Sequence, residues 1–295
     1  MKPVLIFDTS GINCIISEQF ASTPLLPAIQ SAYHIRLTST SVEEVLADPN
    51  RERRARLLDT CRTLMRDGDV VLPFHELISR HFLAFQNDRP FDWQRVPLEA
   101  RDYRREIAFR ERITDELSEE QLRYADETGQ EFEQIYADAR PHFLEIFERH
   151  PELPRPSIEE ILQVFMQPGN VYWKMGADLC RPVCGQAPDE SFVRSFEDAC
   201  PPFRSLLTAL FLTQHDRVIA ERTNSELRKL AGRVDVFSAL FLPYCDIFVS
   251  NDRDQLRFLR KVVGLIGGHT EVVWFRSFMD RIGLGAESRI NASTR

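Results

Sequence analysis

Acidic side chains directly follow two apolar runs in the chain, where carboxylates could hold a cation. Asp8 comes after the run 3–7, and Asp252 comes just after the run 246–250. Parallel strands that end at the same edge of a sheet place such residues over one crevice. The sequence therefore predicts a cluster of carboxylates at the carboxyl edge of a sheet.

Further acids could face the same crevice. Glu43 and Glu44 follow the apolar run 34–39, and Asp235 begins an apolar helix. Two carboxylates about 4 Å apart repel by roughly 1 kcal/mol in water and by about 4 kcal/mol at an effective dielectric constant near 20. A cation relieves this repulsion, and ligands that are all oxygen suit Mg²⁺ or Mn²⁺ better than zinc.

Each of these acids also has a purely local interpretation. Asp8 and Asp252 are placed where helix N-caps are expected. Glu44 is the fourth residue of a capping box that begins at Ser41, and Asp235 lies where a helix dipole favours an acid. The order of the acids along the chain favours a shared site over four separate caps.

Alternating strand and helix patterns predict an α/β fold with a parallel sheet. Strands are expected at residues 3–7, 34–39, 69–74, 246–250 and 271–275. Helices are expected at 12–20, from Ser41 to residue 67, and at 75–85, 216–232, 234–244, 255–262 and 277–284.

The middle of the chain differs in composition from its two ends. Residues 90–215 contain 14 basic and 24 acidic residues, a net charge of −10, whereas the whole chain carries −8. Their pattern is helical, with proline-rich breaks at 151–156, 182–188 and 201–202. We therefore expect one α/β domain made of residues 1–89 and 216–295, split by an acidic helical insertion of residues 90–215.

No targeting or membrane-spanning segment is expected. Asp8 interrupts the first apolar run, and no apolar run approaches the roughly 18 residues that cross a bilayer. The six cysteines lack the spacing of a zinc site, so we expect free thiols and a cytoplasmic protein.

Three segments resemble the PIN-domain family of nucleases: VLIFDTSGINCII at the N-terminus, STSVEEVL after the second strand, and RVDVFSALFLPYCDIFVSNDRDQLRFL near the C-terminus. The resemblance covers residues 1–89 and 216–295. It implies a three-layer α/β/α sandwich with a mainly parallel five-stranded sheet of order 3-2-1-4-5. The 126-residue insertion has no counterpart in the family.

By this resemblance, the chain is expected to be a Mg²⁺- or Mn²⁺-dependent endoribonuclease that hydrolyses mainly single-stranded RNA. The resemblance also implies a protein partner such as an antitoxin, and a homodimer. The implied metal-binding and catalytic residues are Asp8, Glu44, Asp235 and Asp252. Glu43 is the alternative to Glu44, and Asp254 is expected to share or replace the role of Asp252. Ser250 and Asn251 match polar positions that help to place water or metal.

Two arginines are candidates for substrate binding, and two other functions fit parts of the sequence pattern. Arg253 and Arg257 follow Asp252 and are candidates for contacts to substrate phosphates. A haloacid-dehalogenase-type phosphatase would use Asp8 as its nucleophile, but the second acid that this class carries is Ser10 here. The other alternative is a catalytically inactive PIN-like scaffold or partner-binding protein.

Overall fold

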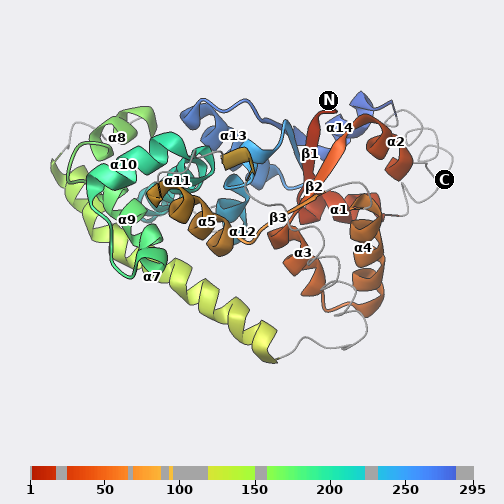
Figure 1. The fold of residues 1–295 in the computed structure, drawn as a ribbon, viewed down its shortest axis with the longest axis horizontal. Coiled ribbons are helices and arrows are strands. Elements are labelled where there is room, and N and C mark those ends of the chain that lie inside the picture. The colour runs from red at the N-terminus through yellow and green to blue at the C-terminus, as the bar shows by residue number, and fades with distance from the viewer. Residues whose placement is uncertain are drawn as a thin grey trace.

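The fold is built on a five-stranded sheet in which all strands are parallel. The computed structural model describes residues 2–17, 25–65, 69–87, 93–95, 119–149, 158–222 and 232–283. The strand order is β3-β2-β1-β4-β5, which confirms the predicted fold class and strand order (Figure 1). The strands are β1 (Val4–Phe7), β2 (His34–Thr38), β3 (Asp69–Val71), β4 (Ile247–Ser250) and β5 (Glu271–Trp274).

The central strands are apolar because helices cover both faces of the sheet. Strand β1 pairs with β2 on one side and with β4 on the other, and Phe7 lies opposite Val249. On the far side of β4, Ser250 lies opposite Trp274 at the end of β5. These registers bring the carboxyl ends of β1, β4 and β5 to one edge.

One face of the sheet is covered by the helices that precede β3 together with the last helix of the described chain. Leu5 and Phe7 of β1 point into this layer, where the ring of Phe7 meets that of Phe278 edge-on at 5.6 Å. The helices are α1 (Thr9–Ile15), α2 (Leu25–Ala32), α3 (Ser39–Leu46), α4 (Arg51–Leu64) and α14 (Phe275–Arg281).

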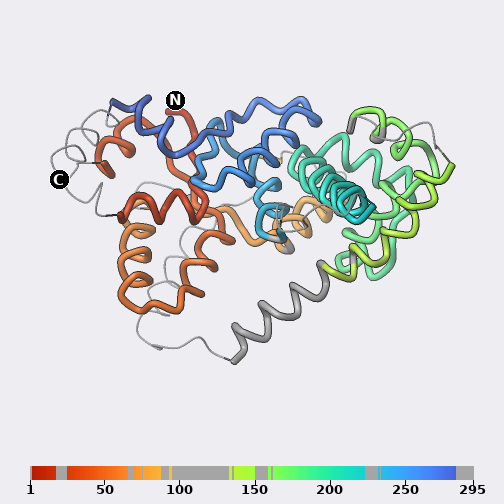
Figure 2. Tube along the Cα trace, turned by 180° about the vertical axis from the view of Figure 1, so that it is seen from behind, coloured from red at the N-terminus to blue at the C-terminus, as the bar shows by residue number. Residues whose placement is uncertain are grey.

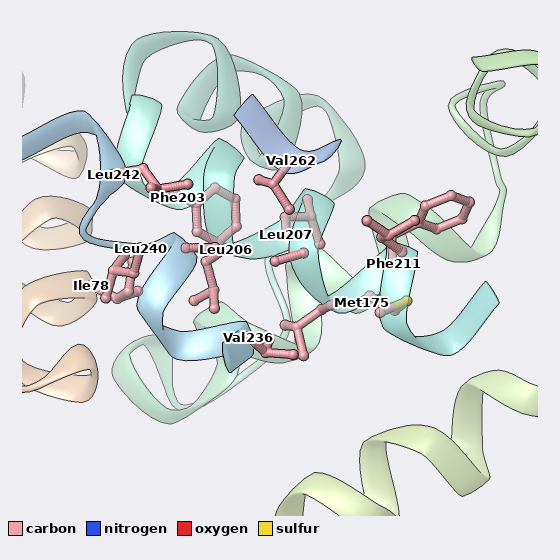
Figure 3. Packing of buried hydrophobic residues seen from close by; sticks show 14 of the residues in the cluster. Ile78, Met175, Phe203, Leu206, Leu207, Phe211, Val236, Leu240, Leu242 and Val262 are labelled. Carbon is pink, nitrogen blue, oxygen red and sulfur yellow. The ribbon is translucent and has the colours of Figure 1, made fainter. Parts of the chain in front are cut away.

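The opposite face packs against a larger apolar core. Ile6 and Phe248 reach into it from the sheet. Around Phe203 and Leu207 of the longest buried helix, side chains from several helices interdigitate (Figure 3). This layer contains α5 (Phe74–Gln86), α11 (Pro201–Arg222), α12 (Arg233–Ala239), the 3₁₀ turn η3 (Leu242–Tyr244) and α13 (Arg253–Ile266).

Every regular element that the structure describes in the predicted insertion is a helix, which agrees with the expectation. Most of its helices gather at the end of the molecule away from β2 and α4 (Figures 1 and 2), and one long helix extends from there toward the side of α3 and α4. Besides most of α11, it contributes the 3₁₀ turn η1 (Trp93–Arg95) and the helices α7 (Glu119–Arg149), α8 (Ile158–Phe165), α9 (Val171–Cys184) and α10 (Glu190–Ala199).

Helix α11 joins the insertion to the sheet-bearing part of the chain. The helix runs without a break through residues 215 and 216, where the sequence pattern places the domain boundary. Every residue from Ser205 to His215 is buried. Arg217 forms a two-pronged ion pair with Glu133 of α7, with both N···O distances 2.9 Å. The division into two units stays a prediction.

Several expected boundaries are corrected. Helix α1 begins at Thr9, three residues before the expected start. Helix α9 continues through Pro182, where a break was predicted, and the expected helix 234–244 is instead α12 followed by η3. Residues 18–20 of the expected helix 12–20 and residues 223–231 of the expected helix 216–232 lie outside the described residues.

The structure also bears on the expectations about the cysteines and about membrane-spanning segments. All six cysteines lie in the described ranges, and each is a free thiol. Among the helices that the structure describes, none is long and apolar enough to cross a membrane.

Candidate functional site at the carboxyl edge of the sheet

Asp8 lies at the centre of the predicted site, in the turn between β1 and α1. Its backbone is extended, and its carboxylate caps α1 by accepting a hydrogen bond from the Gly11 N–H at 2.7 Å. Only 7% of the residue is exposed. The local interpretation as an N-cap is therefore confirmed, but capping leaves the second carboxylate oxygen for other partners.

Two serine hydroxyls bind the same carboxylate. Ser10 donates to both oxygens of Asp8 at 2.8–2.9 Å, and Ser250 at the end of β4 donates to Oδ2 at 2.8 Å. The backbone N–H of Asn251 donates to the Ser10 hydroxyl at 2.7 Å, and that of Asp252 donates to Ser250 at 2.9 Å. These bonds join the ends of β1 and β4 into one polar network.

Burial dominates the electrostatics of Asp8. Loss of hydration raises the pKa of its carboxyl from 3.8 to about 6, because a buried charge is costly. The hydrogen bonds from Gly11, Ser10 and Ser250 act in the opposite direction, since they favour the charged form. Asp8 is thus poised between its neutral and charged forms just below neutral pH.

Glu44 approaches this network through Thr9. The Thr9 hydroxyl donates to Oε2 of Glu44 at 2.5 Å. The predicted capping box is wrong, because α3 begins at Ser39 and its cap is Thr38, whose hydroxyl accepts from the Ser41 N–H. Glu44 is partly buried and Glu43 is exposed, so Glu44 is the better placed of the two for the site.

A second group of acids forms where α12 meets α13. Asp235 accepts a hydrogen bond from the Gly232 N–H at 2.9 Å. Burial raises the pKa of Asp235, and the negative charges of Asp252 and Asp254 raise it further. Asp252 caps α13 by accepting from the N–H groups of Asp254 and Gln255. The side chain of Gln255 lies beside Asp235 and acts to lower its pKa.

The two basic residues predicted to contact phosphates differ in their surroundings. Arg257 forms an ion pair with Asp254 at 2.8 Å. Arg253 instead lies over the ring of Trp274, with 5.0 Å from its guanidinium carbon to the ring centroid. The Trp274 indole N–H donates to the side-chain oxygen of Asn251 at 3.0 Å. Among the described residues, Arg257 is therefore paired with a carboxylate, whereas Arg253 contacts an aromatic ring.

The side chains at this edge of the sheet offer carboxylate, hydroxyl and amide oxygens as ligands. Such oxygen ligands suit the implied Mg²⁺ or Mn²⁺. The buried amide oxygen of Gln255, beside Asp235, has no hydrogen-bond partner within the described residues. No three acidic, histidine or cysteine side chains in that part of the chain come together as a ready metal site. The residues fit an ion held by one or two carboxylates and several waters, which is the usual arrangement for Mg²⁺.

Four functional positions were missed by sequence reasoning. Ser10 and Thr9 follow Asp8 directly, and their hydroxyls were available in the sequence as a signal. Gly11 is needed because a side-chain Cβ there would lie only 3.1 Å from the Val249 carbonyl oxygen and 3.2 Å from Asp8 Oδ1. Trp274 gave no signal, because it falls within the apolar run of the expected strand 271–275.

Comparison of the chain with protein-family models, with curated proteins and with solved structures finds no match. The resemblance to PIN-domain nucleases therefore stays a prediction, and it depends on the sequence pattern.

Proposed function

We propose that the protein is a Mg²⁺- or Mn²⁺-dependent endoribonuclease of the PIN type that hydrolyses mainly single-stranded RNA. One observation carries the proposal. Asp8 is buried at the carboxyl end of β1, and the Ser250 hydroxyl bridges it to the N–H of Asp252 at the end of β4. Acids that follow neighbouring parallel strands are thereby held at one edge, which is where such sheets bind ligands.

The proposed roles follow from the positions of the side chains. Asp8 and Glu44 would hold the ion on the β1 side, together with water molecules. Asp235 and Asp252, on the α12 and α13 side, are the further acids that the resemblance implies, and they would act on the ion through water. Ser10 and Ser250 orient the Asp8 carboxylate by hydrogen bonds.

The reaction is hydrolysis of a phosphodiester. The oxygen of a water molecule attacks phosphorus in line, the bond from phosphorus to the 3′ oxygen breaks, and the 3′ oxygen takes up a proton. When bound, the divalent ion supplies the positive charge that lowers the pKa of water and stabilises the leaving oxygen. The chain's residues hold that ion, place the phosphate and keep Asp8 charged.

The raised pKa of Asp8 sets a pH requirement for the proposed reaction. Since this pKa is about 6, the free protein carries a mostly neutral Asp8 below that pH and a charged one above it. Divalent ions bind the charged carboxylate, so activity is expected to rise as pH increases through 6.

The proposal is tested by incubating labelled single-stranded RNA with the wild type, Asp8→Asn and Glu44→Gln in Mn²⁺, in Mg²⁺ and in EDTA. We expect internal cleavage by the wild type in either metal, and loss of cleavage in EDTA and in both variants. Asp178→Asn is the matched control, since it removes an exposed carboxylate on α9 that is paired with Arg181. Normal cleavage by Asp8→Asn would show that the site is wrongly assigned.

A second candidate function is a catalytically inactive PIN-like scaffold or partner-binding protein. The observation that favours it is that no three potential metal ligands converge within the described residues. A scaffold would bind no divalent ion at Asp8 and would leave RNA intact under all of these conditions.

A further inference from the structure

An aromatic side chain borders the proposed site on its β5 side. Trp274 is the last residue of β5, and it lies opposite Ser250 in the β4–β5 register. Ser250 in turn donates to Asp8. Strand β4 alone therefore separates the strand that ends at Trp274 from the strand that leads to Asp8.

The indole is held in place and has a face that accepts a planar group. Its N–H is fixed by Asn251, and the guanidinium of Arg253 lies over its ring at 5.0 Å. Trp274 is partly exposed and Arg253 is exposed. An exposed side chain covers this face, so the face becomes available to a flat ligand when the guanidinium moves off the ring.

Arg253 is also available to an anion. It forms no ion pair with a carboxylate of the described residues, whereas Arg257, one helical turn on, is paired with Asp254. A guanidinium binds phosphate in a fixed planar geometry, which suits one phosphate of a nucleic-acid backbone.

We propose that Trp274, Asn251 and Arg253 form a nucleotide subsite for single-stranded RNA. One base stacks on the indole of Trp274, and Arg253 swings from the ring to the adjoining phosphate. This inference rests on the proposed function, and it adds the residues that position the substrate and the reason why the substrate is single-stranded.

Single-stranded substrate follows from the stacking. A base inside a duplex has both faces covered by its neighbours, whereas an unpaired base can be turned out onto an aromatic side chain. Stacking of this kind tolerates any base, because every base has a π-face. The subsite therefore selects for strandedness and accepts many sequences.

The first test measures binding without turnover. Asp8→Asn serves as the parent, and the probe is a fluorescently labelled ten-residue oligouridylate followed by anisotropy. We expect Trp274→Leu in this parent to weaken binding about 10-fold, as loss of one stacked base does. Trp274→Phe keeps an aromatic face and is expected to retain most of the affinity. Binding should quench tryptophan fluorescence in the parent and not in Trp274→Leu.

The arginine provides a second and independent variant. Arg253 is exposed, so Arg253→Gln should fold. The variant is expected to bind RNA more weakly, and the slope of log affinity against log salt concentration should fall by the amount of about one phosphate contact. Arg181→Gln is the matched control, since it removes an exposed arginine of α9 that is paired with Asp178, and it should leave both unchanged. Duplex RNA of the same length should compete poorly, and oligothymidylate should lose affinity in Trp274→Leu by the same factor.

The outcomes separate this inference from the proposed function. No binding by the parent, equal binding by Trp274→Leu, or equal competition by duplex RNA would overturn the subsite. Loss of binding in Trp274→Leu, with a wild type that cleaves no RNA, would support the subsite and count against the nuclease. In a wild type that does cleave, Trp274→Leu should raise KM and leave kcat nearly unchanged.

Discussion

Replacing Asp8 by asparagine is expected to stabilise the metal-free protein at neutral pH, although the same change abolishes the proposed activity. Burial raises the pKa of Asp8 from 3.8 to about 6. Between these two values the folded state holds a proton that the unfolded state releases. The free energy of unfolding of the wild type therefore falls as pH rises through this window, and the loss is complete above the folded-state value.

The size of the effect follows from the shift. Each pKa unit corresponds to somewhat more than 1 kcal/mol, so the full penalty for charging Asp8 is about 3 kcal/mol. About half of it develops between roughly pH 5 and pH 8. Asparagine carries no charge, and it can still accept from the Gly11 N–H, although it accepts less well from the two serine hydroxyls. We expect a net stabilisation of about 1–2 kcal/mol near pH 8.

The assay is urea unfolding of the wild type and Asp8→Asn in EDTA across this pH range. The stability difference should grow in favour of the variant as pH rises, and it should level off above about pH 7. Adding Mn²⁺ should stabilise the wild type alone, because only the wild type has the charged ligand. A difference that is independent of pH, or one that favours the wild type more as pH rises, would refute the burial argument.

Further predictions concern the supports of the site. Ser250→Ala removes a donor to Asp8, so it should raise the pKa of Asp8 further, destabilise the fold by about 1–3 kcal/mol in urea unfolding, and move the acidic limb of any activity profile to higher pH. Gly11→Ala places a Cβ 3.1 Å from the Val249 carbonyl oxygen and should cost about 1–3 kcal/mol by the same measurement. Deleting residues 92–214 removes most of α11 from the core and should give an aggregated or partly folded product in size-exclusion chromatography and circular dichroism.

The sheet and its edge were predictable because the signals were local. Each strand is a short apolar run, and Asp8 and Asp252 follow two of them directly. Chain direction alone puts such residues at the carboxyl edge of a parallel sheet. The strand order came from the family resemblance, since periodicity does not specify which strands are neighbours.

The contacts within the site were not predictable, because they join distant parts of the chain. The Asn251 N–H bonds to Ser10 across 241 residues, and Trp274 bonds to Asn251 across a strand pair. The predicted capping box is wrong for a local reason. The helix begins three residues earlier than the pattern suggests, because Thr38 at the end of β2 is the N-cap and its hydroxyl accepts from the Ser41 N–H. This frees Glu44 to accept from Thr9.

The extent of the insertion was also hard to judge from sequence. Charge marked residues 90–215 as distinct, but charge describes a surface and carries no information about packing. The better signal was the nearly continuous apolar stretch of α11, because a helix that is apolar on every side must be buried. Phe203 and Leu207 of that helix pack in the same core as Val236 of α12 (Figure 3).

The central claim is that Asp8 belongs to a divalent-cation site, and calorimetric titration of Mn²⁺ tests it most directly. The titration uses wild type, Asp8→Asn and the control Asp178→Asn near pH 8, where Asp8 is charged. The account predicts saturable binding to the wild type and the control, and loss of that binding in Asp8→Asn. Equal binding to all three proteins, or no binding to the wild type, would contradict it.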